Sequence, residues 1–160
     1  MRDFIERIEN ERPGTVVVAD MEAGLEHLSW AGGTLRYVDL LLVVVQPTAK
    51  VMMTADRTCK LARDLGIPRI AFVGNRALNA SDVERMERFA AERGCELLVA
   101  IPEDRTVPDA DRASRCVLDT APDSDAVRAI ARLADRREDR FVATGRGIRS
   151  IDRSAPRSRK

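Results

Sequence analysis

Four apolar segments without an alternating polar face most constrain how this 160-residue chain can fold. They are residues 15–20 (TVVVAD), 39–46 (DLLLVVVQ), 69–74 (RIAFVG) and 96–101 (ELLVAI). A strand without polar and apolar alternation is usually buried on both faces, as in a parallel sheet that helices cover. These segments are therefore predicted to be the strands of a mostly parallel sheet.

The segments between these strands have the periodicity of amphipathic helices. A helix is predicted over residues 49–65, where apolar side chains recur at spacings of three and four and Gly66 follows as a helix stop. Its apolar face comprises Met52, Ala55, Cys59, Ala62 and Leu65. A second helix is predicted over 82–93, opened by a capping box from Ser81 to Glu84. Its inward side chains are Val83, Met86 and Ala90, and Gly94 closes it.

Two further helices are predicted nearer the ends of the sequence. One spans residues 124–137 with Val127, Ile130 and Leu133–Ala134 on its apolar side. The other is short and spans residues 3–11. This alternation of strands and helices predicts an α/β fold, an open doubly wound sheet flanked by helices.

Composition limits the classes of protein to consider. The 27 Lys and Arg residues nearly balance 26 Asp and Glu, a net charge of +1, which argues against a chain built mainly to bind nucleic acid or acidic membranes. No apolar run approaches the roughly 18 to 20 residues of a membrane span. The charged N-terminal sequence has no signal-peptide core, so a cytoplasmic location is predicted. The widely spaced Cys59, Cys95 and Cys116 are interpreted as small apolar side chains rather than as disulfides or metal ligands.

A change in composition divides the chain. Residues 1–137 are predicted to form one domain, and residues 138–160 form a basic tail without a sustained apolar period. Such a tail is predicted to be disordered and solvated. Contact of the tail with RNA, DNA or anionic lipid is the alternative.

Polar residues cluster where the predicted strands end, which is where open α/β sheets bind ligands. Asp20 follows an apolar run, and a carboxylate in that place can hold a water of hydrated Mg²⁺. Gly24 would let its backbone N–H approach a phosphate closely. The equally weighted alternative is that Asp20 caps a turn and Gly24 supplies a positive φ. Asn75 offers an amide donor and acceptor to a base, although alone it is more often a turn residue.

The motifs at these strand ends resemble those of one family. The string VVVADMEAGLEH resembles the Walker B strand and switch loop of the CooC-type ATPases, which help to mature carbon monoxide dehydrogenase. The strings DLLLVVVQPT, IAFVGNR and AIPEDRTVPDADR follow in the order and spacing of that family, and IPED is also similar to MinD. The resemblance covers roughly residues 14–135. It implies a P-loop NTPase-like fold of the ParA/MinD superfamily, with ATP or ADP and Mg²⁺ as cofactors.

The resemblance also implies roles for residues around the switch loop. Asp20 would be the Walker B carboxylate that acts on Mg²⁺ through water. Gly24 would be the switch glycine that senses the terminal phosphate, and Glu22 would orient water or the switch. His27, beside Trp30, is interpreted as structural rather than catalytic.

Two other segments would form the base-binding side of the nucleotide site. By the resemblance, Asn75 and Arg76 would contact adenine. Pro102, Glu103 and Asp104 would form a loop that closes over the base, largely through backbone groups.

The sequence departs from the family at the phosphate loop. No segment of the form GKGGxGKT is present, and Gly32-Gly33-Thr34 and Gly145-Arg146-Gly147 lack the lysine. The family's metal-binding Cys-x-Cys pair is also absent. We therefore expect weak nucleotide binding at best and no useful hydrolysis by this chain alone, which leaves its status as an enzyme open. In the family, the phosphate-loop strand runs between the equivalents of 15–20 and 39–46. These two strands are predicted to pair directly in a single chain of marginal stability, and the alternatives are that another chain fills the gap or that the chain is poorly stable alone.

Two functional hypotheses remain from the sequence. The first is part of a CooC/MinD-like nucleotide switch, acting in metal-centre maturation or in positioning, with a metalloenzyme client. The second is a non-enzymatic dimerisation or interaction module that regulates an intact paralogue, or forms a homodimer. Nucleic-acid binding through the basic tail ranks last.

Overall fold

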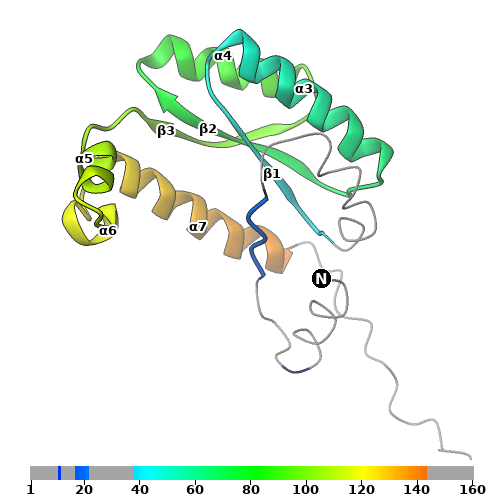
Figure 1. The fold of residues 1–160 in the computed structure, drawn as a ribbon. Coiled ribbons are helices and arrows are strands. Elements are labelled where there is room, and N and C mark those ends of the chain that lie inside the picture. Colours follow the sequence, from blue (N-terminus) through cyan, green and yellow to red (C-terminus); the bar gives the residue numbers. More distant parts are fainter. Residues whose placement is uncertain (1–10, 12–16, 22–37, 144–160) are drawn as a thin grey trace, which may run out of the picture.

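The computed structural model describes Glu11 and residues 17–21 and 38–143. Within them, β1 (Leu41–Val45), β2 (Ile70–Ala77) and β3 (Glu96–Pro102) form a parallel sheet in the order β1-β2-β3 (Figure 1). These strands coincide closely with three of the four predicted apolar segments. The predicted α/β fold with a parallel sheet is confirmed.

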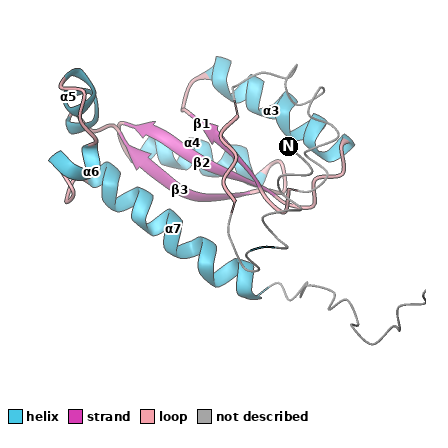
Figure 2. Cartoon of the chain, turned by 60° about the horizontal axis from the view of Figure 1, so that its bottom comes forward, coloured by secondary structure: helices cyan, strands magenta, loops and turns pink. Residues whose placement is uncertain are grey.

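Helices cover both faces of the sheet. The helices α3 (Ala49–Asp64) and α4 (Ala80–Ala91) lie on one face, and α7 (Asp125–Ala143) lies on the other, where it packs mainly on β3 (Figure 2). Along the chain, two short helices, α5 (Thr106–Arg112) and α6 (Val117–Thr120), connect β3 to α7. This is the doubly wound arrangement that the sequence predicts.

The largest apolar core lies between the sheet and the α3–α4 layer. The predicted inward face of α3 is buried at Met52, Ala55, Cys59 and Ala62, and half-buried at Leu65. Phe72 of β2 and Met86 of α4 are fully buried in the same core. The pKa of the Cys59 thiol is raised to about 11, chiefly by burial. Cys59 therefore behaves as the predicted small apolar side chain.

Gly66 ends α3 as predicted, through a Schellman motif. Its φ is +76°, and its N–H donates to the carbonyl of Arg63 at 2.9 Å. The N–H of Ile67 donates to the carbonyl of Ala62 at 3.0 Å, and both of these side chains are buried in one small cluster. The motif satisfies carbonyls at the helix end and directs the chain into β2.

The predicted cap of α4 is wrong by two residues. The N-cap is Asn79, whose Oδ1 accepts from the N–H of Asp82 at 3.0 Å, while Asp82 Oδ2 accepts from the N–H of Leu78 at 2.9 Å. The start of the helix is therefore held by Asn79 and Asp82 rather than by Ser81 and Glu84, and the Asp82 carboxylate reaches the residue before the N-cap instead of closing a capping box. The Asn amide competes well with Ser for this position.

The predicted first strand is wrong for its described part. Residues 17–20 belong to no strand, and Val18 is 72% exposed. The predicted direct pairing of this segment with β1 is also absent there. A strand is stable only where its backbone has a ladder partner and its side chains are buried, and this segment has neither.

Helix α7 differs from its prediction in length and in face. It continues to Ala143, so the tail predicted to begin at residue 138 is helical over its first residues. As predicted, Val127 is buried and Leu133 is half-buried. Within residues 125–135 the other buried side chains are Ala126 and Ala129, whereas Ile130 is 46% exposed and Ala134 is exposed. The rest of the tail and residues 3–10 of the short predicted helix lie outside the described residues.

No helix in the described part of the chain is long and apolar enough to cross a membrane. The three cysteines are free; Cys95 is half-buried and Cys116 is exposed. Among the described residues, no three His, Cys, Asp or Glu side chains gather as a metal site.

Substitution of Gly74 by alanine is expected to destabilise the protein. An added Cβ would lie 2.9 Å from Met86 Cε and 3.3 Å from the backbone Cα of Ala100. Overpacking of this kind costs about 1–3 kcal/mol in the free energy of unfolding, which urea denaturation measures. In a Met86→Ala background the same substitution should cost less. An equal cost in both backgrounds would contradict the packing explanation.

Candidate nucleotide-base site at the strand ends

The parallel register brings the predicted base-site residues to one rim. Gly74 pairs with Val45 on one side and with Ala100 on the other, and Ala77 pairs with Pro102. The carboxyl ends of all three strands therefore lie at the same edge of the sheet. The predicted residues that meet there are Asn75, Arg76, Pro102, Glu103 and Asp104.

A β-bulge shapes β2 at this rim. Between Gly74 and Ala77 the strand β2 contains one more residue than the facing part of β3. Arg76 has a φ of 59°, a left-handed conformation that is rare for a residue other than glycine. Bulges and positive-φ residues concentrate next to functional sites because they redirect side chains. Here the bulge turns Arg76 out of the ladder.

The redirected Arg76 forms a two-point ion pair with Glu103. Arg76 Nε lies 2.7 Å from Glu103 Oε2, and Nη2 lies 3.3 Å from Oε1. The Arg76 hydrogen bond lowers the pKa of Glu103, and the pKa of Arg76 is raised in turn. Glu103 also donates its N–H to the Ala77 carbonyl at 2.9 Å. Because water screens exposed ion pairs, this pair contributes little to the stability of the fold, and it joins the bulge to the loop after β3.

Asp104 links the rim to two helices. Its Oδ1 accepts from the Thr106 hydroxyl at 2.6 Å and from the Thr106 N–H at 2.9 Å. Its Oδ2 accepts from the N–H of Ala126 in the first turn of α7, at 3.1 Å. The Thr106 hydroxyl is the largest of the causes that lower the Asp104 pKa to about 2. Both carboxylate oxygens of Asp104 are thus used in hydrogen bonds to α5 and α7.

Asn75 has its side chain available for a ligand. It is half-buried on β2 beside the bulge and makes no side-chain hydrogen bond within residues 17–21 and 38–143. A half-buried amide without a partner is an amide that can bind a ligand's donor and acceptor. The adenine contact of Asn75 stays a prediction.

The predicted switch residues are tested only in small part. Asp20 is exposed and lies in no strand. Gly24, Glu22, His27 and Trp30 lie outside the described residues. The Mg²⁺ and switch roles of Asp20, Gly24 and Glu22 therefore stay predictions.

The sequence reasoning missed two groups that shape the site. Thr106 follows Asp104 at the spacing of an Asx turn, so the string Asp-Arg-Thr carried a usable signal. No local sequence pattern indicates the hydrogen bond from the N–H of Ala126, because 22 residues separate it from Asp104.

Comparisons with known proteins identify relatives of this chain. The carbon monoxide dehydrogenase accessory protein CooC of Rhodospirillum rubrum is 35% identical over 126 residues, covering 76% of this chain and 44% of that protein. An uncharacterised ATP-binding protein of Methanocaldococcus jannaschii is 40% identical over 92 residues, covering 58% of this chain and 35% of that protein. No protein-family model matches the chain.

Solved structures share the fold. The MinD cell division protein of Aquifex aeolicus superposes with a TM-score of 0.70 at 22% identity, over 86% of this chain and 58% of that one. The cell division ATPase MinD of Pyrococcus furiosus gives a TM-score of 0.61 at 17% identity, over 86% of this chain and 56% of that one. The chain belongs to the CooC/MinD-like P-loop ATPase family. It spans less than half the length of the curated relatives that it matches.

The Asp104 contacts predict a pH dependence of stability. The folded-state pKa of about 2 lies below the ordinary value of 3.8, so the stabilisation is present above about pH 4 and is lost as pH falls through 2. The melting temperature should therefore fall across that range. Asp104→Asn should melt lower than the wild type at pH 7 and lose less on acidification.

The control for this experiment is Asp135→Asn, which changes an exposed carboxylate on α7. It should keep the wild-type melting temperature and acid profile in circular dichroism. An Asp104→Asn profile parallel to the wild type would show that these hydrogen bonds do not stabilise the fold.

Proposed function

We infer that this chain provides the base-binding side of an ATP site and works as part of a nucleotide switch. The half-buried Asn75 amide, unpartnered within the described residues, carries this proposal. It lies beside a bulge and a loop that the Arg76–Glu103 ion pair joins. Backbone that is already held in place costs little to order when a ligand binds.

The base would bind at the rim through both hydrogen-bonding functions of Asn75. Backbone groups of the loop from Pro102 to Asp104 would line the other side, because the side chains of Glu103 and Asp104 are engaged elsewhere. Arg76 would act chiefly by holding Glu103 rather than by touching the base. Support for ATP comes from the ATP-binding relative of Methanocaldococcus jannaschii.

Mg²⁺ would neutralise the phosphate charge when nucleotide is bound. A MinD protein of Pyrococcus horikoshii is known in complex with Mg-ADP, with a TM-score of 0.52 to this chain. In this chain Asp20 would hold Mg²⁺ through water, and Gly24 and Glu22 would respond to the terminal phosphate. Asp20 is exposed, so its carboxylate is accessible to a hydrated ion.

The process that such a switch serves is inferred from the relatives. CooC is named as a carbon monoxide dehydrogenase accessory protein, which favours maturation of a metal centre, with that metalloenzyme as the client. MinD, a cell division protein known in complex with MinC, supports a role through protein partners, including a homodimer or an intact paralogue. The cytoplasmic location stays a prediction.

Calorimetry of the full chain with Mg²⁺-ATP tests the proposal. Asn75→Ala should weaken ATP binding about tenfold, the loss of about 1.4 kcal/mol of hydrogen bonding to the base. Asp20→Ala should weaken binding only when Mg²⁺ is present. Arg132→Ala, an exposed change on α7, is the control. Absence of heat at about millimolar nucleotide, the range of the weakest specific ligands, would refute nucleotide binding by this chain.

The alternative is an interaction module that regulates an intact paralogue without binding nucleotide itself. The exposure of Val44 favours it: this apolar side chain is 58% exposed, whereas the other side chains of β1 are buried or half-buried. Parallel strands are normally covered on both faces. Mixing the chain with labelled ATP and an intact relative separates the two proposals. A dissociation constant for ATP below about 10 μM for this chain alone would exclude the interaction-only function.

A further inference from the structure

A groove opens between α3 and the end of α4, lined by none of the rim residues. Its volume is about 260 Å³. Its apolar lining consists of Met52 and Met53 from α3 and Phe89 from α4. Met52 and Phe89 are buried against the core, whereas Met53 is 61% exposed. An exposed methionine beside a buried aromatic ring gives the groove an adaptable apolar contact surface.

The charged lining of the groove has an excess of cations. Its only acidic member is Asp56, which Lys60 Nζ approaches at 2.8 Å and Arg93 Nε at 2.8 Å. Arg57 also lines the groove, is exposed, and makes no ion pair within the described part of the chain. Among the described residues, the lining therefore carries three cations and one carboxylate, and Arg57 is left without an ion pair. The groove attracts a negatively charged partner.

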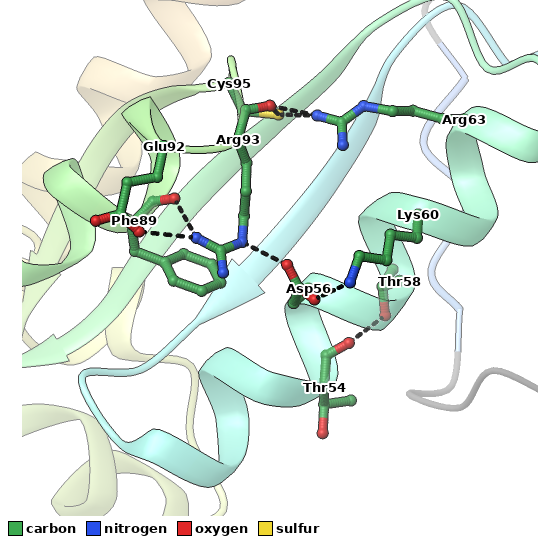
Figure 3. Close-up of polar contacts among 9 residues, drawn as sticks. All are labelled: Thr54, Asp56, Thr58, Lys60, Arg63, Phe89, Glu92, Arg93 and Cys95. Carbon is green, nitrogen blue, oxygen red and sulfur yellow. Dashed lines mark hydrogen bonds and ion pairs between the residues drawn. The ribbon is translucent and has the colours of Figure 1, made fainter.

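Arg93 follows α4 and reaches across to Asp56 of α3 (Figure 3). Its Nη1 donates to the carbonyl of Phe89 at 2.9 Å and lies 3.3 Å from Glu92 Oε2. Its guanidinium carbon lies 3.6 Å from the centre of the Phe89 ring, and Arg63 of α3 donates to its carbonyl. The two helices are thus tied together on this side, and a partner meets a site that is already formed.

We propose that this groove docks an acidic amphipathic segment of a partner protein. One apolar side chain of the segment inserts between Met53 and Phe89, and its carboxylates pair with Arg57 and Lys60. Met53 gives such a segment an exposed apolar contact next to the cations Arg57 and Lys60. This proposal does not depend on nucleotide binding.

The probe is a synthetic helical peptide of about 16 residues with Leu and Glu on one face, about four turns. Its twin carries Lys at each Glu position. Titrated into the ¹⁵N-labelled full chain, the acidic peptide should shift amide signals at residues 52–60 and 89–93. Its affinity should fall as salt rises, and the Lys twin should not bind.

Two pairs of matched variants assign the binding to the groove. Arg57→Glu should weaken the acidic peptide about tenfold, while Arg132→Glu, the same charge change on α7, should leave it unchanged. Met53→Ser should also weaken it, while Leu118→Ser should not. Met53 and Leu118 are 61% and 58% exposed, so the two substitutions are comparable and neither should lower the melting temperature.

Several results would overturn the proposal. They are absence of peptide binding at millimolar concentration, equal binding of the Lys twin, signal shifts outside the groove, or equal effects of the two arginine variants. Binding to phosphatidylserine vesicles that Arg57→Glu abolishes, together with no peptide binding, would assign the surface to membranes instead. Loss of ATP binding would leave this proposal untouched, and loss of peptide binding would leave the nucleotide proposal untouched.

Discussion

The hydrogen bonds of Asp104 connect the sheet to everything that follows it in the chain. One oxygen of this carboxylate binds Thr106 at the start of α5, and the other binds the N–H of Ala126 in the first turn of α7. A carboxylate at a helix N-terminus also interacts favourably with the helix dipole. Because α7 covers the sheet mainly at β3, this one side chain sets where the second helical layer begins. It also fixes the loop that forms one side of the rim.

The other side of the rim depends on a local irregularity in β2. The bulge after Gly74 places Arg76 at a φ of 59°, and the ion pair with Glu103 joins that residue to the loop after β3. Gly74 itself lies against Met86, so the strand before the bulge is fixed by the core. The bulge and the loop therefore support each other. Asn75 lies between these fixed points with its amide unpartnered in the described residues, and that combination makes the rim a candidate binding site.

The sequence predicts those parts of the structure that depend on regular burial. The apolar runs identify β1, β2 and β3, and the spacing of Met52, Ala55, Cys59 and Ala62 identifies the buried face of α3. It also brings Asn75 and Glu103 to one rim, because parallel strands end at the same edge. Prediction fails where a long-range contact decides. Residues 17–20 have the composition of a strand but no ladder partner in the described structure. On α7, Ala126 and Ala129 are buried while the larger Ile130 is exposed. No local pattern reveals the bulge at Arg76.

The two faces of the sheet are covered unequally, and this affects the three strand ends differently. Val43 and Val45 of β1 are buried under α3, whereas Val44 points to the other face and is 58% exposed. Helix α7 packs mainly on β3, so β1 is supported on one face only within the described residues. A strand held on one face opens more easily than one held on both. Within the described residues, side-chain contacts join the rim at β2 and β3, whereas Val44 of β1 stays exposed on the face that α7 covers at β3. Binding at that face would therefore stabilise the part of the rim that is least well held by the chain itself.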